Sequence, residues 1–598
     1  MLIKFVVHIF ILVFISNLSI GLVANDPYGN LLDSSTVPTN SFLQNMNMDN
    51  DGVIDINKFD EDFENIVVCN TLTDFEKGSR NCMQNIHEIM SNKIYGINNN
   101  IHQLLSFASA SAANSGVSSA KLLMFKYNSP GFNPYSIVTH KTPNQVLSGL
   151  VVIPLDANKN ILSEDKIKGV LLYYHPTIIS KNGIPSGYGD IDTISMKKTF
   201  YYQEMLTAIF TSNGYIVVAP DYIGQGLDVN TVHPYVVAPD VNALSGIYML
   251  KALSTYLNQK YNFHFTNTNL YISSYSEGAA YSLKASELLQ NNYNYILSDL
   301  GLKLKHTFGV SGAYDVSGTT ANFLFDNVDV SANNKWSVAS GCYQTDNNFC
   351  DQEPNGLDNV IAQYEVAKFR PMLGAYVVQT MLNYYVDSFS IFYKLFTTSN
   401  FYYQKNCVNF STFNSSSISN IGDCSSLFNN NSKDLIDYIN NKNINFNSFL
   451  YQLQSASFAE GFFIGNARNQ TEAIALLSNP ANSYTSDQSF MNIQLKTNKF
   501  GNDLIKSADT YHWTTGSPVS IIYLNHDSVV TNLNSLLACD PVKGIQGTSL
   551  GLVNCIPVDN SKLWEADSLF QSNQLYPTYL NHEYAEGILQ IVALQQML

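Results

Sequence analysis

The sequence predicts an α/β fold with a mostly parallel sheet, helices on both faces and a large insertion. Helical patterns at 242–257 and 279–289 lie between short apolar segments of the length expected for buried strands. Strands that alternate with helices indicate parallel pairing through crossover connections. The apolar segments lie at 146–155, 168–175, 214–220, 270–273, 307–311 and 519–524.

The long gap between the last two strands predicts an inserted cap. About two hundred residues rich in Asn and aromatic side chains separate them, and a structureless loop of that length is improbable in a compact domain. We therefore divide the core into two parts, 119–319 and 511–598, with the cap at 320–510. The aromatic residues of the cap suit an apolar substrate pocket, and a side domain far from the site is the alternative.

The N-terminus predicts export from the cytoplasm. Lys4 precedes an almost wholly apolar segment at 5–15, which is too short to span a membrane comfortably. We interpret residues 1–24 as a signal peptide, with a retained anchor helix as the alternative. Residues 25–118 are predicted to form a polar N-terminal extension that becomes helical.

Eight cysteines are consistent with a secreted protein, extracellular or periplasmic. They fall into four neighbouring pairs, and pairing within each is the simplest hypothesis, although sequence alone does not decide connectivity. No Cys-x-x-Cys spacing occurs, so a zinc site is not expected. The predicted disulfides are Cys69–Cys82, Cys342–Cys350, Cys407–Cys424 and Cys539–Cys555.

The charge balance argues against nucleic acid as a partner. The formal net charge is -16 at pH 7, and the chain contains no run of basic residues. An acidic surface repels a phosphate backbone, so we expect no binding to nucleic acid. The composition leaves the oligomeric state open.

A short motif at 274–278 carries the strongest chemical signal. Ser274-Tyr275-Ser276-Glu277-Gly278 follows a predicted strand and opens a predicted helix, as a nucleophile elbow does in the α/β-hydrolase fold. The turn needs small residues two positions before and after the nucleophile, and Ser274 and Gly278 are small. We therefore predict Ser276 as the nucleophile, with an ordinary Ser-rich strand end as the alternative.

An acid and a base follow in the chain order expected for this fold, which is Ser, Asp, His. Asp527 comes just after the strand at 519–524, and His582 precedes the last amphipathic helix. We predict that Asp527 orients His582 and that His582 is the base. Asp527 could instead cap a helix. His526 is a rival base, but its neighbour Asp527 would then have to point elsewhere.

An oxyanion needs two backbone N–H donors. We expect one from Glu277, directly after the nucleophile. The other should come from the loop His175-Pro176-Thr177 after the strand at 168–175. Because Pro176 has no N–H, Thr177 is the better candidate.

Several segments resemble secreted bacterial esterases and lipases of the α/β-hydrolase superfamily, related to the secretory-lipase group. The resemblance covers about residues 120–320 and the Asp and His regions, and it implies hydrolysis of an ester or lipid substrate without a cofactor. We also expect transient contact with a lipid surface. The family usually has Gly where this chain has Pro176 and Ser274. The segments are 221–226 (Asp-Tyr-Ile-Gly-Gln-Gly), 233–235 (His-Pro-Tyr), 312–318 (Gly-Ala-Tyr-Asp-Val-Ser-Gly), 148–149 (Ser-Gly) and the elbow.

The hypothesis from these residues is a serine hydrolase that cleaves carboxylic esters through an acyl-enzyme on Ser276. Two alternatives stay open. A peptidase of the same fold would use the same triad, although no further motif for recognising a peptide terminus is evident. A catalytically inactive binding protein could keep the fold without the activity, because fold alone does not fix function.

A second motif suggests a calcium loop. Asp49, Asp51 and Asp55 lie in a segment that resembles part of an EF-hand, with Gly52 in place. Lys58 stands where that loop has a bidentate Glu, and a Lys opposes a cation. An acidic exposed turn is the alternative.

Overall fold

The computed structural model describes the core of the chain. The predicted signal peptide, three of the four predicted disulfides, Lys58, His526 and nearly all of the predicted cap lie outside the described residues. Those residues are 28–37, 48–56, 111–112, 114–131, 144–178, 183–188, 193–228, 231, 233–321, 336–337, 342–343, 373, 377, 505–525, 527, 529–558, 582 and 585–598.

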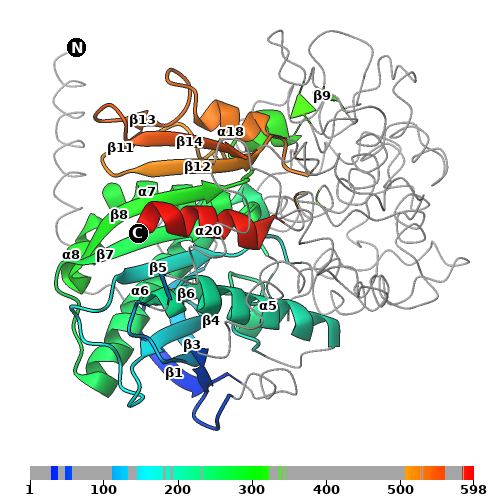
Figure 1. Cartoon of the computed structure of the whole chain (residues 1–598). Helices are drawn as coiled ribbons and strands as arrows, with labels where there is room; N and C mark the ends of the chain where they lie inside the picture. Colours follow the sequence, from blue (N-terminus) through cyan, green and yellow to red (C-terminus); the bar gives the residue numbers. More distant parts are fainter. Residues whose placement is uncertain are drawn as a thin grey trace, which may run out of the picture.

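A ten-stranded mixed sheet forms the centre of the described part (Figure 1). Its order is β1-β3-β4-β6-β5-β7-β8-β12-β14, and β2 also pairs with β3. The strands are β1 (Leu31–Thr36), β2 (Val53–Asp55), β3 (Ser119–Pro130), β4 (Asn144–Leu155), β5 (Gly169–Tyr174), β6 (Tyr215–Pro220), β7 (Thr268–Ser274), β8 (Leu302–Val310), β12 (Val519–Leu524) and β14 (Val553–Val558).

The sheet has an antiparallel end and a parallel end. Pairing is antiparallel from β1 to β6 and parallel from β6 through β5, β7, β8 and β12 to β14. Every residue of β5, β6 and β12 is buried, which is typical of parallel strands covered on both faces. The predicted strands are all present, and β8 begins at Leu302, earlier than the apolar segment suggested.

Helices cover both faces of the sheet, as predicted. α6 packs against α7 on one face, and α5 packs against α20 on the other, where Figure 1 shows α20 lying over the parallel strands. These helices are α5 (Thr193–Ile209), α6 (Pro239–Tyr261), α7 (Glu277–Gln290) and α20 (Glu586–Met597). The shorter ones are η5 (Thr211–Asn213), η6 (Gly226–Asp228), η7 (Tyr235–Val237), α8 (Asn294–Leu300), η8 (Val316–Thr320) and α18 (Leu533–Ala538).

Part of the predicted N-terminal extension belongs to the central sheet. β1 and β2 both pair antiparallel with β3, which starts one residue after the predicted boundary at 118. Val53 and Ile54 of β2 are buried in the main apolar core. A three-residue strand is too short to give a period-2 pattern, so the sequence showed only a polar segment here.

Two small two-stranded sheets lie outside the central one. β9 (Trp336–Ser337) pairs with β10 (Cys342–Tyr343), and β11 (Thr514–Thr515) pairs with β13 (Gln546–Gly547). The predicted disulfide Cys539–Cys555 is confirmed, and it joins the end of α18 to β14. Within the described part of the chain, no helix has both the length and the apolar character to cross a membrane.

Candidate active site

The elbow between β7 and α7 places Ser276 in a strained turn. Ser276 has φ 52° and ψ -117°, a left-handed conformation that is rare for a residue with a side chain. A Cβ on Gly278 would lie 2.2 Å from the carbonyl oxygen of Tyr174, so only glycine fits there. Ser276 therefore lies in a sharp turn between the end of β7 and the start of α7, which is the geometry of a nucleophile elbow.

Ser274 replaces the usual glycine without leaving a polar atom unpaired. Its Oγ donates to the carbonyl oxygen of Phe308 at 2.9 Å and shares a 2.7 Å hydrogen bond with Oγ of Ser282. Ser274 is fully buried, so an unpaired hydroxyl would be costly at this position. The departure from the family pattern is therefore accommodated by these two partners.

The pairing register brings the two predicted oxyanion segments together. β5 and β7 run parallel with Tyr174 opposite Ser274, so the residues after each strand leave the sheet side by side. The Tyr275 N–H donates to the carbonyl oxygen of Tyr174 at 3.1 Å. Thr177 consequently lies in the loop beside the elbow that carries Ser276.

The structure brings the predicted nucleophile, base and acid into one chain of hydrogen bonds. His582 Nε2 lies 2.8 Å from Ser276 Oγ, and His582 Nδ1 lies 2.8 Å from Asp527 Oδ2. All three residues are buried. Because an ionised carboxylate only accepts hydrogen bonds, Nδ1 carries the proton and Nε2 is free to accept the proton of Ser276.

Asp527 is held by the backbone that follows it. Its Oδ1 accepts the N–H groups of Val529 at 3.0 Å and Val530 at 2.8 Å, which leaves Oδ2 for His582. One oxygen therefore orients His582, and the other closes the turn at 529–530. The alternative role of Asp527 as a helix cap is wrong, because α18 begins only at Leu533 and its N-cap residue is Asn532.

Tyr275 holds the backbone of His582, a contact that the sequence did not reveal. Its hydroxyl donates to the carbonyl oxygen of His582 at 2.6 Å, and its ring stacks on the imidazole with centroids 5.2 Å apart. The next helix is fixed in the same region, because Gln590 Nε2 donates to the carbonyl of Ser274 and its Oε1 accepts from Ser273 Oγ. α20, which begins four residues after the base, is thus tied to the strand that carries the nucleophile.

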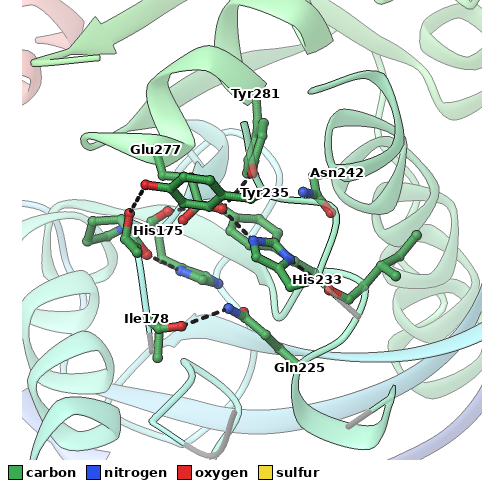
Figure 2. A network of polar contacts seen from close by, with 12 residues as sticks. His175, Ile178, Gln225, His233, Tyr235, Asn242, Glu277 and Tyr281 are labelled. Carbon is green, nitrogen blue, oxygen red and sulfur yellow. Dashed lines mark hydrogen bonds and ion pairs between the residues drawn. The ribbon is translucent and has the colours of Figure 1, made fainter. Parts of the chain in front are cut away.

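The predicted oxyanion donors are the N–H groups of Glu277 and Thr177, and Figure 2 shows the polar network around Glu277. Within the described residues, neither the N–H of Glu277 nor that of Thr177 donates a hydrogen bond. Thr177 Oγ1 lies 3.3 Å from the hydroxyl of Tyr235. Glu277 is 2 % exposed, and its carboxyl group belongs to a polar network with His233 and Tyr281 (Figure 2).

Asp221 starts the loop that approaches the oxyanion side. It follows β6 directly and accepts the N–H of Ser186 at 3.0 Å as well as the Ser186 hydroxyl. Burial raises the pKa of Asp221 to about 6, against the opposing effect of these donors. This carboxyl therefore carries a desolvation cost near neutral pH.

The acidic loop predicted as a calcium site is held by protein contacts. Asp49 Oδ1 accepts the N–H groups of Asp51 and Val53, and Oδ2 binds the ammonium group of Lys159 at 2.7 Å. These donors lower the pKa of Asp49, against a raising effect of burial. Among the described residues, no group of three or more His, Cys, Asp or Glu side chains gathers as a metal would require. Calcium binding stays an untested hypothesis, and Lys159 already occupies one side of Asp49.

The topology, the elbow after β7, the acid after β12 and the base before α20 together define the α/β-hydrolase fold. No family model matches the sequence. No curated protein matches it either.

The chain is similar to several solved structures. An esterase that degrades the rice cell wall, LipA from Xanthomonas oryzae, is 14% identical with a TM-score of 0.46, covering 82% of this chain and 94% of that one. A putative hydrolase from Legionella pneumophila is 16% identical with a TM-score of 0.45 and the same coverage. Candida antarctica lipase A in its closed state is 11% identical with a TM-score of 0.36, covering 77% of this chain and 80% of that one.

Proposed function

We propose that this protein is a secreted serine hydrolase that cleaves carboxylic esters through an acyl-enzyme on Ser276. The observation that carries the proposal is the chain of two 2.8 Å hydrogen bonds from Ser276 through His582 to Asp527. A serine hydroxyl is a weak nucleophile and needs a neutral base within hydrogen-bond distance. The strained conformation of Ser276 supports the same role, since strain of this kind gathers at functional sites.

The first half of the reaction forms the acyl-enzyme. Oγ of Ser276 attacks the ester carbonyl carbon while its proton moves to Nε2 of His582, and Asp527 stabilises the imidazolium that results. The carbonyl oxygen becomes an oxyanion, which accepts hydrogen bonds from the N–H groups of Glu277 and Thr177. When the intermediate collapses, His582 returns the proton to the leaving alcohol oxygen.

The second half releases the acid. A water molecule gives a proton to Nε2 of His582 and attacks the acyl carbon, and the same two N–H groups receive the second oxyanion. The intermediate then expels Oγ of Ser276, which takes back the proton from His582. No step needs a metal or cofactor to balance protons or electrons.

Two further parts of the proposal rest on the sequence. The resemblance of segments 221–226 and 312–318 to secreted esterases and lipases favours an ester or lipid substrate over a peptide. The apolar segment at 5–15 and the disulfide Cys539–Cys555 support export to an oxidising compartment.

A fluorophosphonate probe together with a substrate panel tests the proposal. We expect the probe to label Ser276, and nitrophenyl esters to be hydrolysed much faster than aminoacyl amides. Faster cleavage of the amides would make the protein a peptidase. An unlabelled Ser276 in folded protein would contradict the acyl-enzyme and favour a binding protein.

A further inference from the structure

One loop contacts both predicted oxyanion segments. It runs from β6 to η7 through residues 222–228, 231 and 233–235 of the described chain, and Figure 2 shows its side chains converging on the elbow and the β5 loop. Its contacts are Tyr222 Oη with the His175 carbonyl at 2.8 Å, Gln225 Nε2 with the Ile178 carbonyl at 3.3 Å, Tyr235 Oη with Thr177 Oγ1 at 3.3 Å, and His233 Nε2 with Glu277 Oε1 at 2.5 Å.

The backbone of this loop is built to bring His233 close. Gly224 has φ 81°, and a Cβ there would lie 2.4 Å from the backbone nitrogen of His233. Tyr222 also has a positive φ of 63°, which is unusual for a bulky residue. Its ring lies nearly parallel to that of His233, with centroids 5.8 Å apart and an interplanar angle of 9°. The tight turn and the stacked ring fix the orientation of the imidazole.

His233 and Glu277 form a fully desolvated pair. Their side chains are 3% and 0% exposed, and their closest atoms are 2.5 Å apart. His233 Nδ1 lies 2.8 Å from the carbonyl oxygen of Ile223, so Nδ1 must carry a proton. One more proton lies between Nε2 and Oε1. The pair is therefore neutral overall, whether that proton resides on the imidazole or on the carboxyl group.

The carboxyl group of Glu277 depends on this neutralisation. Oε1 also accepts the hydroxyl of Tyr281 at 2.5 Å, but Oε2 has no hydrogen-bond partner among the described residues. An unpaired charge at this depth is costly. It would also repel the oxyanion that the backbone N–H of the same residue has to stabilise, because screening by water is absent.

We propose that His233 is a positioning residue of the oxyanion hole. It fixes the first residue of α7 and cancels the negative charge of Glu277 behind the developing oxyanion. Tyr235, on the same loop, holds the Thr177 side of the hole. This inference rests on the proposed ester hydrolysis and adds a residue that acts through Glu277 without touching the substrate.

The test compares the variants His233→Asn, Glu277→Gln and their double variant in the hydrolysis of a nitrophenyl ester. His233→Asn removes the shared proton and keeps an amide that can donate to the Ile223 carbonyl. We expect kcat to fall on the order of 10- to 100-fold with KM nearly unchanged, because the loss concerns the oxyanion. Glu277→Gln leaves a neutral pair, since its amide can donate to neutral His233, and we expect kcat to stay within about fivefold of wild type.

The double variant Glu277→Gln, His233→Asn separates the charge role from simple packing. If His233 neutralises Glu277, the double variant is faster than His233→Asn alone, because no carboxylate remains to repel the oxyanion. If His233 only fills space, the double variant is as slow as the single one or slower. Affinity for a boronic acid that mimics the tetrahedral adduct should follow kcat through the series.

A control variant and two further outcomes show how each result is interpreted. His306→Asn removes another largely buried histidine, one that contacts Ser520 Oγ at 2.9 Å, and it should leave kcat unchanged. If His233→Asn does not fold, Glu277→Gln still decides, because a loss in kcat above about fivefold contradicts the proposal. A wild-type protein that cleaves no ester removes both proposals, whereas an active wild type whose double variant shows no recovery removes this one alone.

Discussion

The site contains two buried carboxylates that are held in different ways. On the acid–base side, Asp527 accepts two backbone N–H groups on one oxygen and His582 on the other. On the oxyanion side, the carboxyl group of Glu277 forms hydrogen bonds within the described part of the chain with side chains alone, those of His233 and Tyr281. Backbone donors stabilise the carboxylate of Asp527, whereas a proton shared with His233 balances the charge of Glu277. Replacing the carboxylate by an amide at the two positions should therefore lower kcat by very different amounts.

The largest effect should come from the acid–base side. Ser276→Ala and His582→Ala should each lower kcat on the order of 10⁶-fold, since each removes a member of a unit that acts together. The double variant should be little slower than either single one. Steady-state hydrolysis of a nitrophenyl ester measures this.

His526→Ala is the control for the base, and it should keep substantial activity. An inactive His526→Ala beside an active His582→Ala would show that the base is misassigned. Ester hydrolysis by Ser276→Ala at the wild-type rate would refute the elbow interpretation.

The second prediction tests directly whether Asp527 and Glu277 are held in different ways. Asp527→Asn should lower kcat on the order of 10⁴-fold, because the amide cannot stabilise the imidazolium and favours the wrong tautomer. Glu277→Gln makes the same change from carboxylate to amide and should cost no more than about fivefold. Comparing kcat and thermal stability of the two variants separates the two roles. Equal losses in both would mean that the two carboxylates are not held as described.

The elbow, the acid and the base could be predicted from the sequence. The elbow is a motif of neighbouring residues, and the three catalytic residues occur in the chain order expected for this fold. Gly278 and Ser276 fall in five consecutive residues, and Asp527 follows an apolar strand directly. Their chain order then pointed to His582. The distances could not be predicted, because they depend on α20 packing across β7 through Gln590.

The role of His233 could not be predicted from the sequence. Its segment, His233-Pro234-Tyr235, resembled a family pattern, but the pattern names no partner. Glu277 becomes its partner only because β5 pairs with both β6 and β7, so that the loop after β6 reaches the elbow after β7. Non-local pairing of this kind leaves no periodic signal in the chain. Four strands of the central sheet, at 31–36, 53–55, 119–130 and 553–558, were not predicted either.

A third prediction concerns stability on the oxyanion side. The pKa of the fully buried Asp221 is about 6, against an ordinary value of 3.8, so the folded protein keeps this proton to higher pH than the unfolded chain. The contribution of Asp221 to the free energy of unfolding must then fall as pH rises from about 4 through about 6, and it becomes constant once Asp221 is ionised in both states. Asp221→Asn removes the titration. Its stability relative to wild type should rise by up to about 3 kcal/mol from pH 4 to pH 7.

Urea unfolding of both proteins across that pH range measures the difference. Asp540→Asn is a matched control of opposite sign, because backbone N–H groups of Lys543 and Val542 lower the pKa of this exposed carboxyl group. Its stability relative to wild type should decline slightly as pH rises. Parallel curves for Asp221→Asn and wild type would show that the buried carboxyl carries no desolvation cost.

The smallest effect tests whether the two sides act independently. Tyr275→Phe keeps the ring stacked on His582 but removes the hydroxyl that donates to its carbonyl at 2.6 Å. Tyr281→Phe removes the hydroxyl that donates to Glu277 at 2.5 Å on the other side. Each lost hydrogen bond should lower kcat about fivefold, the equivalent of roughly 1 kcal/mol. If the two sides are independent, the double variant loses about 25-fold, the product of the single effects. A markedly smaller or larger loss would mean that the base and the oxyanion hole are coupled through the elbow between Tyr275 and Glu277.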